Sequence, residues 1–261
     1  MYKFFIKKIF FDGWDNMLSL LVPNIFILAV ITLFSFGSHY IIEYSVAAAY
    51  ILLAIGFVCV VIGIFAFGSS AASIADYKVI TVKDYFKQIP KVLKDGILFS
   101  LLLGLCFVLL FVAIPFYVNW GNTVGLLLAA LVLWIVIMTF LALQWFLPIR
   151  SLMHNNFRKC LKKSFILFFD NPGFSLFLFL YDAVLTVLSL PVFFMIPSFA
   201  GVVLAQINGV RLRLYKYDWL EDHPNATKKQ KKNIPWKELI EQDVENVGPR
   251  SIKNFIFPGR S

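Results

Sequence analysis

The chain has 261 residues, of which 60% are hydrophobic and 15% are charged, and its formal net charge is +9. Soluble domains are about half apolar and about one quarter charged, so a water-soluble fold of this size could not cover so much apolar surface. The composition therefore excludes an ordinary soluble globular protein and indicates helices that cross a lipid bilayer.

The first four predicted membrane spans follow from uncharged runs, because a spanning helix needs about 20 apolar residues. Two such runs are 17–36 and 46–67. The stretch between Asp95 and Arg150 contains no ionised side chain and is too long for a single crossing. Its polar segment 119–122 divides it into two further spans, 96–118 and 124–147.

The last two predicted spans are shorter. The sequence Asn171-Pro172-Gly173 breaks the chain and begins a fifth span, 173–190. Pro191 and Pro197 bracket a short turn, after which a sixth span covers 198–214. We therefore predict an all-α membrane protein with three parts: an interfacial N-terminal segment 1–16, a six-helix membrane domain 17–215, and a cytoplasmic tail 216–261.

The basic residues predict the orientation of these helices. In the six-span arrangement, every Lys and Arg falls in the N-terminal segment, in the loops that join spans two to three and four to five, or in the tail. The opposite loops contain only His39 and Glu43 as ionisable groups. Basic residues stay on the cytoplasmic side, so both termini are predicted to be cytoplasmic.

Two of the basic loops, 84–94 and 155–163, combine Lys or Arg with aromatic side chains and are predicted to form amphipathic helices on the headgroup surface. Thr81 and Asp84 have the spacing of a capping box before the first of them. The Lys-rich run 228–232 in the tail favours anionic lipid over nucleic acid as its partner. The candidate contacts to anionic lipid of the inner leaflet are Lys87, Lys91, Lys94, Arg158, Lys159, Lys162 and Lys163.

Asp182 is the candidate for intramembrane chemistry. It lies nine residues into the fifth span, roughly 13–14 Å from its inner end. A carboxylate at that depth costs about 2.5–3.5 kcal/mol, so it needs a partner or a function. Gln206 and Asn208 lie at a comparable depth, and Asn24 and Gln144 are further polar candidates. These residues would line a proton- or solute-coupling site; the alternative is that Asp182 and its partners form a polar clasp that joins the fifth and sixth helices.

No enzymatic or metal-binding motif is present in the sequence. Cys59, Cys106 and Cys160 have no zinc or redox spacing, and no phosphate-binding loop or His-Glu-x-x-His motif occurs. The three histidines lie outside the predicted spans, so no nucleophile within a span has a base. We expect no catalytic residue, no metal and no cofactor.

The sequence resembles the YesL-like family of bacterial membrane proteins over residues 67–102 and 144–190. The resemblance is carried by the small-residue run 68–73, by Asp84-Tyr85-Phe86-Lys87, by Gln144 with Pro148, and by Phe157 with Leu161-Lys162-Lys163. It implies a multi-pass protein of the bacterial cytoplasmic membrane whose activity is poorly defined, in a family often associated with carbohydrate uptake.

Two functions are compatible with these observations. The resemblance, the basic inner loops and the long tail favour a non-enzymatic accessory or partner component of a membrane transport system. The alternative is a small-solute transporter in its own right, with a polar site at the middle of the membrane around Asp182.

Overall fold

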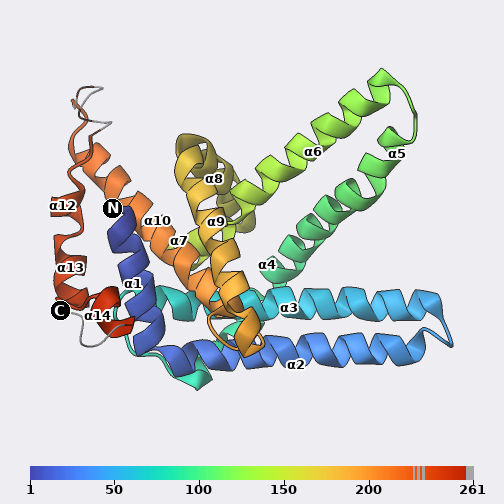
Figure 1. Cartoon of the computed structure of the whole chain (residues 1–261), viewed down its shortest axis with the longest axis horizontal. Coiled ribbons are helices and arrows are strands. Elements are labelled where there is room, and N and C mark those ends of the chain that lie inside the picture. The colour runs from blue at the N-terminus through green and yellow to red at the C-terminus, as the bar shows by residue number, and fades with distance from the viewer. Residues whose placement is uncertain (226, 228–229, 231–232, 257–261) are drawn as a thin grey trace.

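The computed structural model describes residues 1–225, 227, 230 and 233–256, and this part of the chain is helical without a β-strand. Its elements, labelled in Figure 1, are α1 (Tyr2–Asp15), α2 (Met17–Ile41), α3 (Val46–Ala75), α4 (Val82–Val108), the π-helical turn η1 (Leu109–Ala113), α5 (Ile114–Val118), α6 (Thr123–Leu143), α7 (Phe146–Met153), α8 (Phe157–Asp170), α9 (Pro172–Leu188), the 3₁₀ turn η2 (Leu190–Val192), α10 (Ser198–Asp222), α12 (Trp236–Leu239), α13 (Glu241–Val247) and α14 (Ile252–Ile256).

Four helical segments are long and apolar enough to cross a membrane: α2, α3, the continuous segment Val82–Val118, and Thr123–Met153. Helices α8 and α9 make a fifth if the pair, which is bent by 104°, counts as one span. The described part of the chain is therefore all-α, with four or five helices able to span a membrane. The predicted sixth span, 198–214, is not among them: it forms part of α10, which continues to Asp222 and carries several charged residues.

The segment 84–94 differs from the prediction of a separate interfacial helix, because it forms the first turns of α4 and continues directly into the apolar part. The predicted capping box is confirmed at its start. The backbone N–H and the hydroxyl of Thr81 both donate to Asp84 Oδ2, at 3.0 and 2.7 Å. The second predicted helix does form a separate element, α8, although it extends to Asp170.

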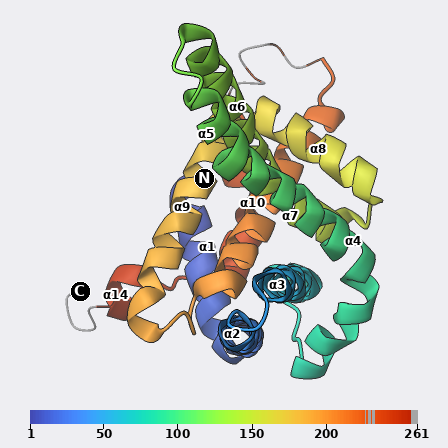
Figure 2. The ribbon, with the colours of Figure 1, turned by 90° about the vertical axis from the view of Figure 1, so that its right-hand side faces the viewer.

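The helices form two hairpins on a common base (Figure 1). One hairpin consists of α2 and α3, and the other of α4 to α6; the two diverge from the base, which is made of α1 and α7 to α10. Viewed along the first hairpin, α10 lies inside the base between α9 and α3 (Figure 2). Because α10 packs against α1, α2, α3, α7 and α9, about half of its length is buried.

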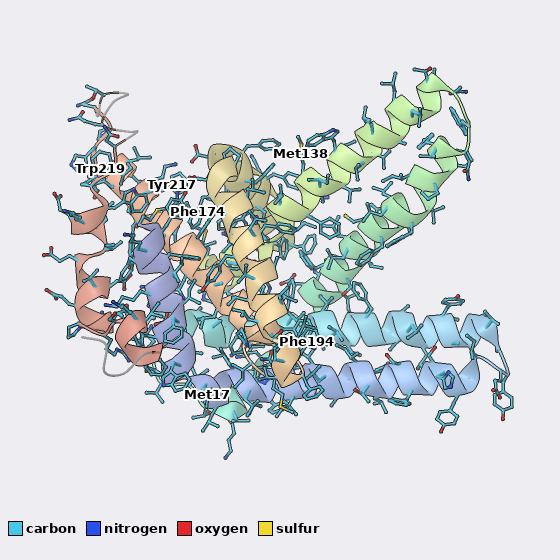
Figure 3. The ribbon with its side chains drawn as sticks, in the orientation of Figure 1. Met17, Met138, Phe174, Phe194, Tyr217 and Trp219 are labelled. Carbon is cyan, nitrogen blue, oxygen red and sulfur yellow. The ribbon has the colours of Figure 1, made fainter. Side chains whose placement is uncertain are left out.

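The packed core lies in the base, whereas the outer parts of the hairpins expose apolar side chains. In Figure 3, Phe174 lies within the base and Met138 on the second hairpin. Phe174 is buried among the rings of Tyr2, Phe5 and Phe177. Met138 is 41% exposed, as expected for a side chain whose solvent is lipid.

Gly68 allows α3 and α7 to approach closely in the base. A Cβ atom at this position would lie 2.4 Å from Ser151 Oγ and 2.8 Å from Leu147 Cδ1, which is closer than real contacts allow. The small-residue run 68–73 therefore includes a glycine whose missing side chain leaves room for Ser151 and Leu147 of α7.

The described C-terminal residues also pack on the base. Lys7 Nζ donates to the backbone oxygen of Gly248 at 2.8 Å, and the rings of Trp14 and Phe255 meet edge to face, with centroids 4.7 Å apart. Part of the predicted tail is thus held against α1. The four lysines of the run 228–232 lie outside the described residues.

Candidate functional site

Asp182 and Gln206 meet across α9 and α10. Gln206 Nε2 donates to Asp182 Oδ2 at 2.8 Å, and Asp182 is only 8% exposed. The second carboxylate oxygen, Oδ1, is buried and has no hydrogen-bond partner among the described residues. The two side chains have the geometry of a clasp between neighbouring helices, and the carboxylate still has an unused acceptor.

The other three polar candidates make separate contacts. Asn24 is fully buried and holds the turn between α9 and α10. Its Nδ2 donates to the backbone oxygens of Met195 and Pro197, at 2.8 and 3.0 Å, and its Oδ1 accepts the backbone N–H of Ala200 at 2.9 Å. The bond from Ala200 satisfies one of the N–H groups at the start of α10 that have no partner within the helix.

Gln144 and Asn208 lie in two further places. Gln144 Nε2 donates to the backbone oxygens of Leu141 and Ser175, at 2.7 and 3.0 Å. Asn208 Nδ2 donates to Asp12 Oδ2 at 3.1 Å. The structure therefore brings Asp182 and Gln206 together and places Asn24, Gln144 and Asn208 in separate contacts.

A cavity of about 270 Å³ borders Gln206. Thr186, Ser198 and Gln206 contribute polar groups to it, and the rest of the lining is apolar. Asp182 is not one of its lining residues. Gln206 therefore connects the carboxylate to this cavity, and the coupling site around Asp182 stays a prediction.

The base also contains a buried ion pair, Lys8 with Asp12, which the sequence pattern did not indicate as a site. Lys8 Nζ lies 3.0 Å from Asp12 Oδ2, and both side chains are at most 5% exposed. Lys8 also donates to the backbone oxygen of Ala75 at 3.1 Å, and Asp12 accepts from Asn208. Burial lowers the pKa of Lys8 and raises the pKa of Asp12, while the attraction between the two charges opposes both shifts.

A second group of charges lies beside this pair and includes the C-terminal part of the chain. Arg211 forms ion pairs with Asp76 and, at 3.6 Å, with Asp243 of α13. The hydroxyls of Tyr77 and Tyr215 donate to the Asp243 carboxylate at 3.0 and 3.1 Å. Burial and the nearby Asp243 charge raise the pKa of Tyr77, which keeps its phenol protonated as a donor.

These contacts join α1, the end of α3, α10 and α13. The only local sequence signal for them is the spacing of Lys8 and Asp12, which places the two side chains on the same face of a helix. The described residues contain no cluster of three His, Cys, Asp or Glu side chains that could hold a metal ion. The network connects these four parts of the chain through buried and partly buried contacts.

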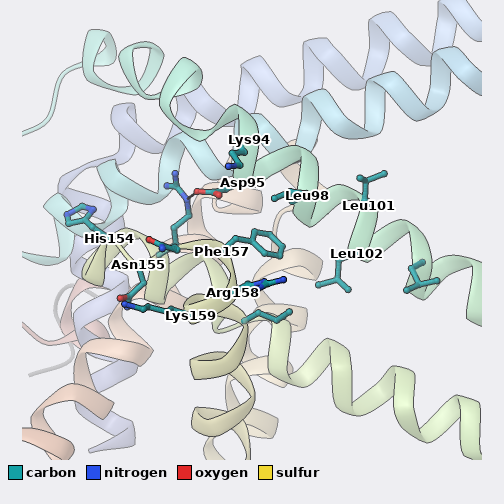
Figure 4. Close-up of a pocket in the computed structure, with 14 residues that line it drawn as sticks. Lys94, Asp95, Leu98, Leu101, Leu102, His154, Asn155, Phe157, Arg158 and Lys159 are labelled. Carbon is teal, nitrogen blue, oxygen red and sulfur yellow. Dashed lines mark hydrogen bonds and ion pairs between the residues drawn. The ribbon is translucent and has the colours of Figure 1, made fainter.

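A groove of about 1220 Å³ runs between α4 and the α7–α8 turn (Figure 4). Cationic side chains of Lys94, Arg158 and Lys159 line it, together with four leucines of α4, namely Leu98, Leu101, Leu102 and Leu105. Asp95 also lines the groove, but it is paired with Arg150 at 2.6 Å between Nε and Oδ2. The groove therefore combines a basic part with an apolar part.

The seven cations predicted to contact lipid fall into three groups. Lys94, Arg158 and Lys159 converge on the groove from two different segments. Lys91 lines a neighbouring polar cavity of about 480 Å³ that shares Arg150 and His154 with the groove. Lys87, Lys162 and Lys163 are exposed and line neither of these two spaces.

Comparison of the chain with family models, with curated proteins and with solved structures finds no match.

Proposed function

We propose that the chain is a non-enzymatic membrane protein that acts as an accessory or partner component of a membrane transport system. The observation that supports this most is the divergence of the two apolar hairpins (Figure 1). Helices that diverge in lipid leave apolar faces on which helices of another membrane protein can pack. The resemblance to the YesL-like family implies carbohydrate uptake as the class of transport.

The contacts of the polar residues agree with this proposal. A transporter generally binds its substrate near the bilayer midplane, at polar groups that several helices direct towards one place. Here Asn24, Gln144 and Asn208 are each engaged elsewhere, so Asp182 shares its position only with Gln206. Such an arrangement suits helix packing better than passage of a solute.

Copurification tests the proposal directly. The full chain, extracted from its native membrane in mild detergent, is expected to carry the same membrane protein or proteins at constant stoichiometry in repeated preparations. The association should survive an exposed control substitution such as Lys83→Gln. Recovery of the chain alone, as a single folded species, would contradict an accessory role.

A transporter in its own right is the second candidate, and two observations favour it. Asp182 Oδ1 has no partner among the described residues, and Gln206 lines the cavity of about 270 Å³. A carboxylate with an unused acceptor next to a cavity could bind a proton or a small polar solute.

The variant Asp182→Asn separates the two candidates. If the pair is a clasp, the amide keeps a hydrogen bond to Gln206, so stability should change by less than about 1 kcal/mol and uptake should be unaffected. Protein level, the Tm in detergent and uptake of labelled sugars into proteoliposomes measure these outcomes. A folded variant with normal level that loses uptake would establish the transporter instead.

We also propose a six-span topology in the bacterial cytoplasmic membrane, with both termini in the cytoplasm and anionic lipids at the inner leaflet. In this arrangement α9 and the first part of α10 supply the fifth and sixth crossings, 173–190 and 198–214. The support comes from the charges: no Lys or Arg occurs between Lys8 and Lys78 or between Lys94 and Arg150.

Thiol labelling checks this orientation. In a chain whose three cysteines are replaced by serine, Glu43→Cys and Asn119→Cys are expected to react with a membrane-impermeant reagent in intact cells. Lys78→Cys, which is also exposed in the structure, should react only after permeabilisation. Labelling of Lys78→Cys in intact cells would contradict the proposed orientation.

A further inference from the structure

The groove between α4 and the α7–α8 turn has an excess of positive charge. Lys94, Arg158 and Lys159 contribute three cations, and among the described residues none of them has a carboxylate within ion-pair distance. The only acidic lining residue, Asp95, is neutralised by Arg150. An anion that entered the groove would therefore meet cations from two sides.

The start of α8 adds to this preference for an anion. The first turn of a helix carries positive partial charge, which favours acidic side chains and disfavours basic ones. In α8 the first turn contains Arg158 and Lys159 and no acidic residue. Asn155, just before the helix, has a buried side-chain Nδ2 without an acceptor among the described residues. The local sequence thus gathers positive charge at a position where a bound anion would stabilise the helix.

The part of the groove that follows α4 beyond Asp95 is lined by leucines and has the length of one lipid leaflet. Leu98, Leu101, Leu102 and Leu105 have the i, i+3, i+4, i+7 spacing of neighbours along α4 and line the groove, and Figure 4 shows Leu98 and Leu102 on the side of α4 towards Phe157 and Arg158 of α8. At the helical rise, Lys94 and Leu105 are about 16 Å apart along the axis, which matches half of a hydrocarbon core of about 30 Å. Leu101 is 64% exposed, so an acyl chain can reach this face.

We propose that this groove is a binding site for one anionic phospholipid from the leaflet on the basic side of the protein. Its phosphate is held by Lys94, Arg158 and Lys159, and one acyl chain follows the leucines of α4. The argument is charge complementarity at one end of the groove combined with an apolar face of leaflet length. It differs from a general attraction of the basic loops to the membrane, because only three of the seven candidate cations line the groove.

Helix α8 has two cations that line the groove and two that do not, and this difference provides a matched test. Two double variants remove the same charge from the same helix: Arg158→Gln with Lys159→Gln in the groove, and Lys162→Gln with Lys163→Gln outside it. The full chain is purified from nanodiscs that contain phosphatidylglycerol and phosphatidylcholine, and native mass spectrometry then counts the bound lipids. The wild-type chain should retain one phosphatidylglycerol.

The groove variant is expected to bind this lipid about 30-fold more weakly, which corresponds to about 2 kcal/mol. The control variant should stay within about twofold of the wild type. Lys94→Gln, on the opposite wall, should weaken binding by about fivefold and checks the result independently of α8. Equal losses in the groove variant and the control, or equal retention of phosphatidylcholine, would overturn the site.

Inorganic phosphate distinguishes the lipid from a free anion. At constant ionic strength, replacing chloride by phosphate at millimolar concentration should leave the bound phosphatidylglycerol in place, since the acyl chain contributes to binding. Displacement of the lipid by phosphate would show a site for the free anion and would overturn the proposal. The Tm of each variant should equal that of the wild type, because the replaced side chains are exposed.

Discussion

Replacing Lys8 by methionine is expected to lower the free energy of unfolding by about 3–5 kcal/mol, because it leaves the buried Asp12 carboxylate without its counter-charge. Lys8 also holds the backbone oxygen of Ala75, so the change removes a contact between α1 and the end of α3. Thermal unfolding of the purified protein in detergent measures the loss. The level of the variant in the membrane should fall accordingly.

Two further variants show whether the ion pair is responsible. Lys3→Met removes the same side chain from an exposed position of the same helix and should change the stability by less than about 0.5 kcal/mol. The double variant Lys8→Met with Asp12→Leu should recover much of the loss, since an apolar pair of similar volume often replaces a buried ion pair without net cost. A Lys8→Met protein as stable as the wild type would contradict the role of the pair.

Replacing Trp145 by alanine is expected to cost about 3–5 kcal/mol, because it leaves a large cavity in the base. Trp145 has no exposed surface, its ring stacks on Phe174, and its Nε1 donates to Ser175 Oγ at 3.0 Å. The substitution therefore removes packing and a hydrogen bond that both connect the start of α7 to α9. The Tm in detergent and the resistance of the protein to proteolysis measure the effect.

Trp134 supplies the matched control. It lies on α6 and is 61% exposed, so Trp134→Ala should change the stability by less than about 0.5 kcal/mol. Similar losses at Trp145 and Trp134 would mean that the second hairpin is packed as tightly as the base, against the structure. Trp145→Phe should fall between the two, because it keeps most of the apolar volume and loses the donor.

The helices that were predicted most closely are those whose ends carry local signals. The start of α2 at Met17 and of α3 at Val46 agrees with the prediction, and α6 begins one residue earlier than expected. Charges and polar caps limit such helices, and both act on neighbouring residues. The structure of the segment 84–94 was harder to predict, because a separate basic helix at the membrane surface and the first turns of a longer helix have the same local pattern.

The polar candidates show that the depth of a residue in the membrane does not by itself predict which residue it contacts. Gln206 and Asn208 lie at a similar depth, but residues two apart on a helix face different sides. Gln206 accordingly contacts Asp182, while Asn208 points towards Asp12 of α1. Helical rise predicts the depth of a side chain, whereas its partner depends on how the helices are rotated and packed.

Composition and charge distribution are sufficient to predict several helices apolar enough to cross a membrane, because transfer into lipid depends on each residue and its neighbours. Three other features depended on the folded arrangement. The two hairpins diverge, the contacts of Lys8, Asp12, Arg211 and Asp243 connect α1 with α10 and α13, and Lys94 lies in one groove with Arg158 and Lys159. These contacts join segments that are distant along the chain, and no local periodicity or spacing encodes which of them will meet.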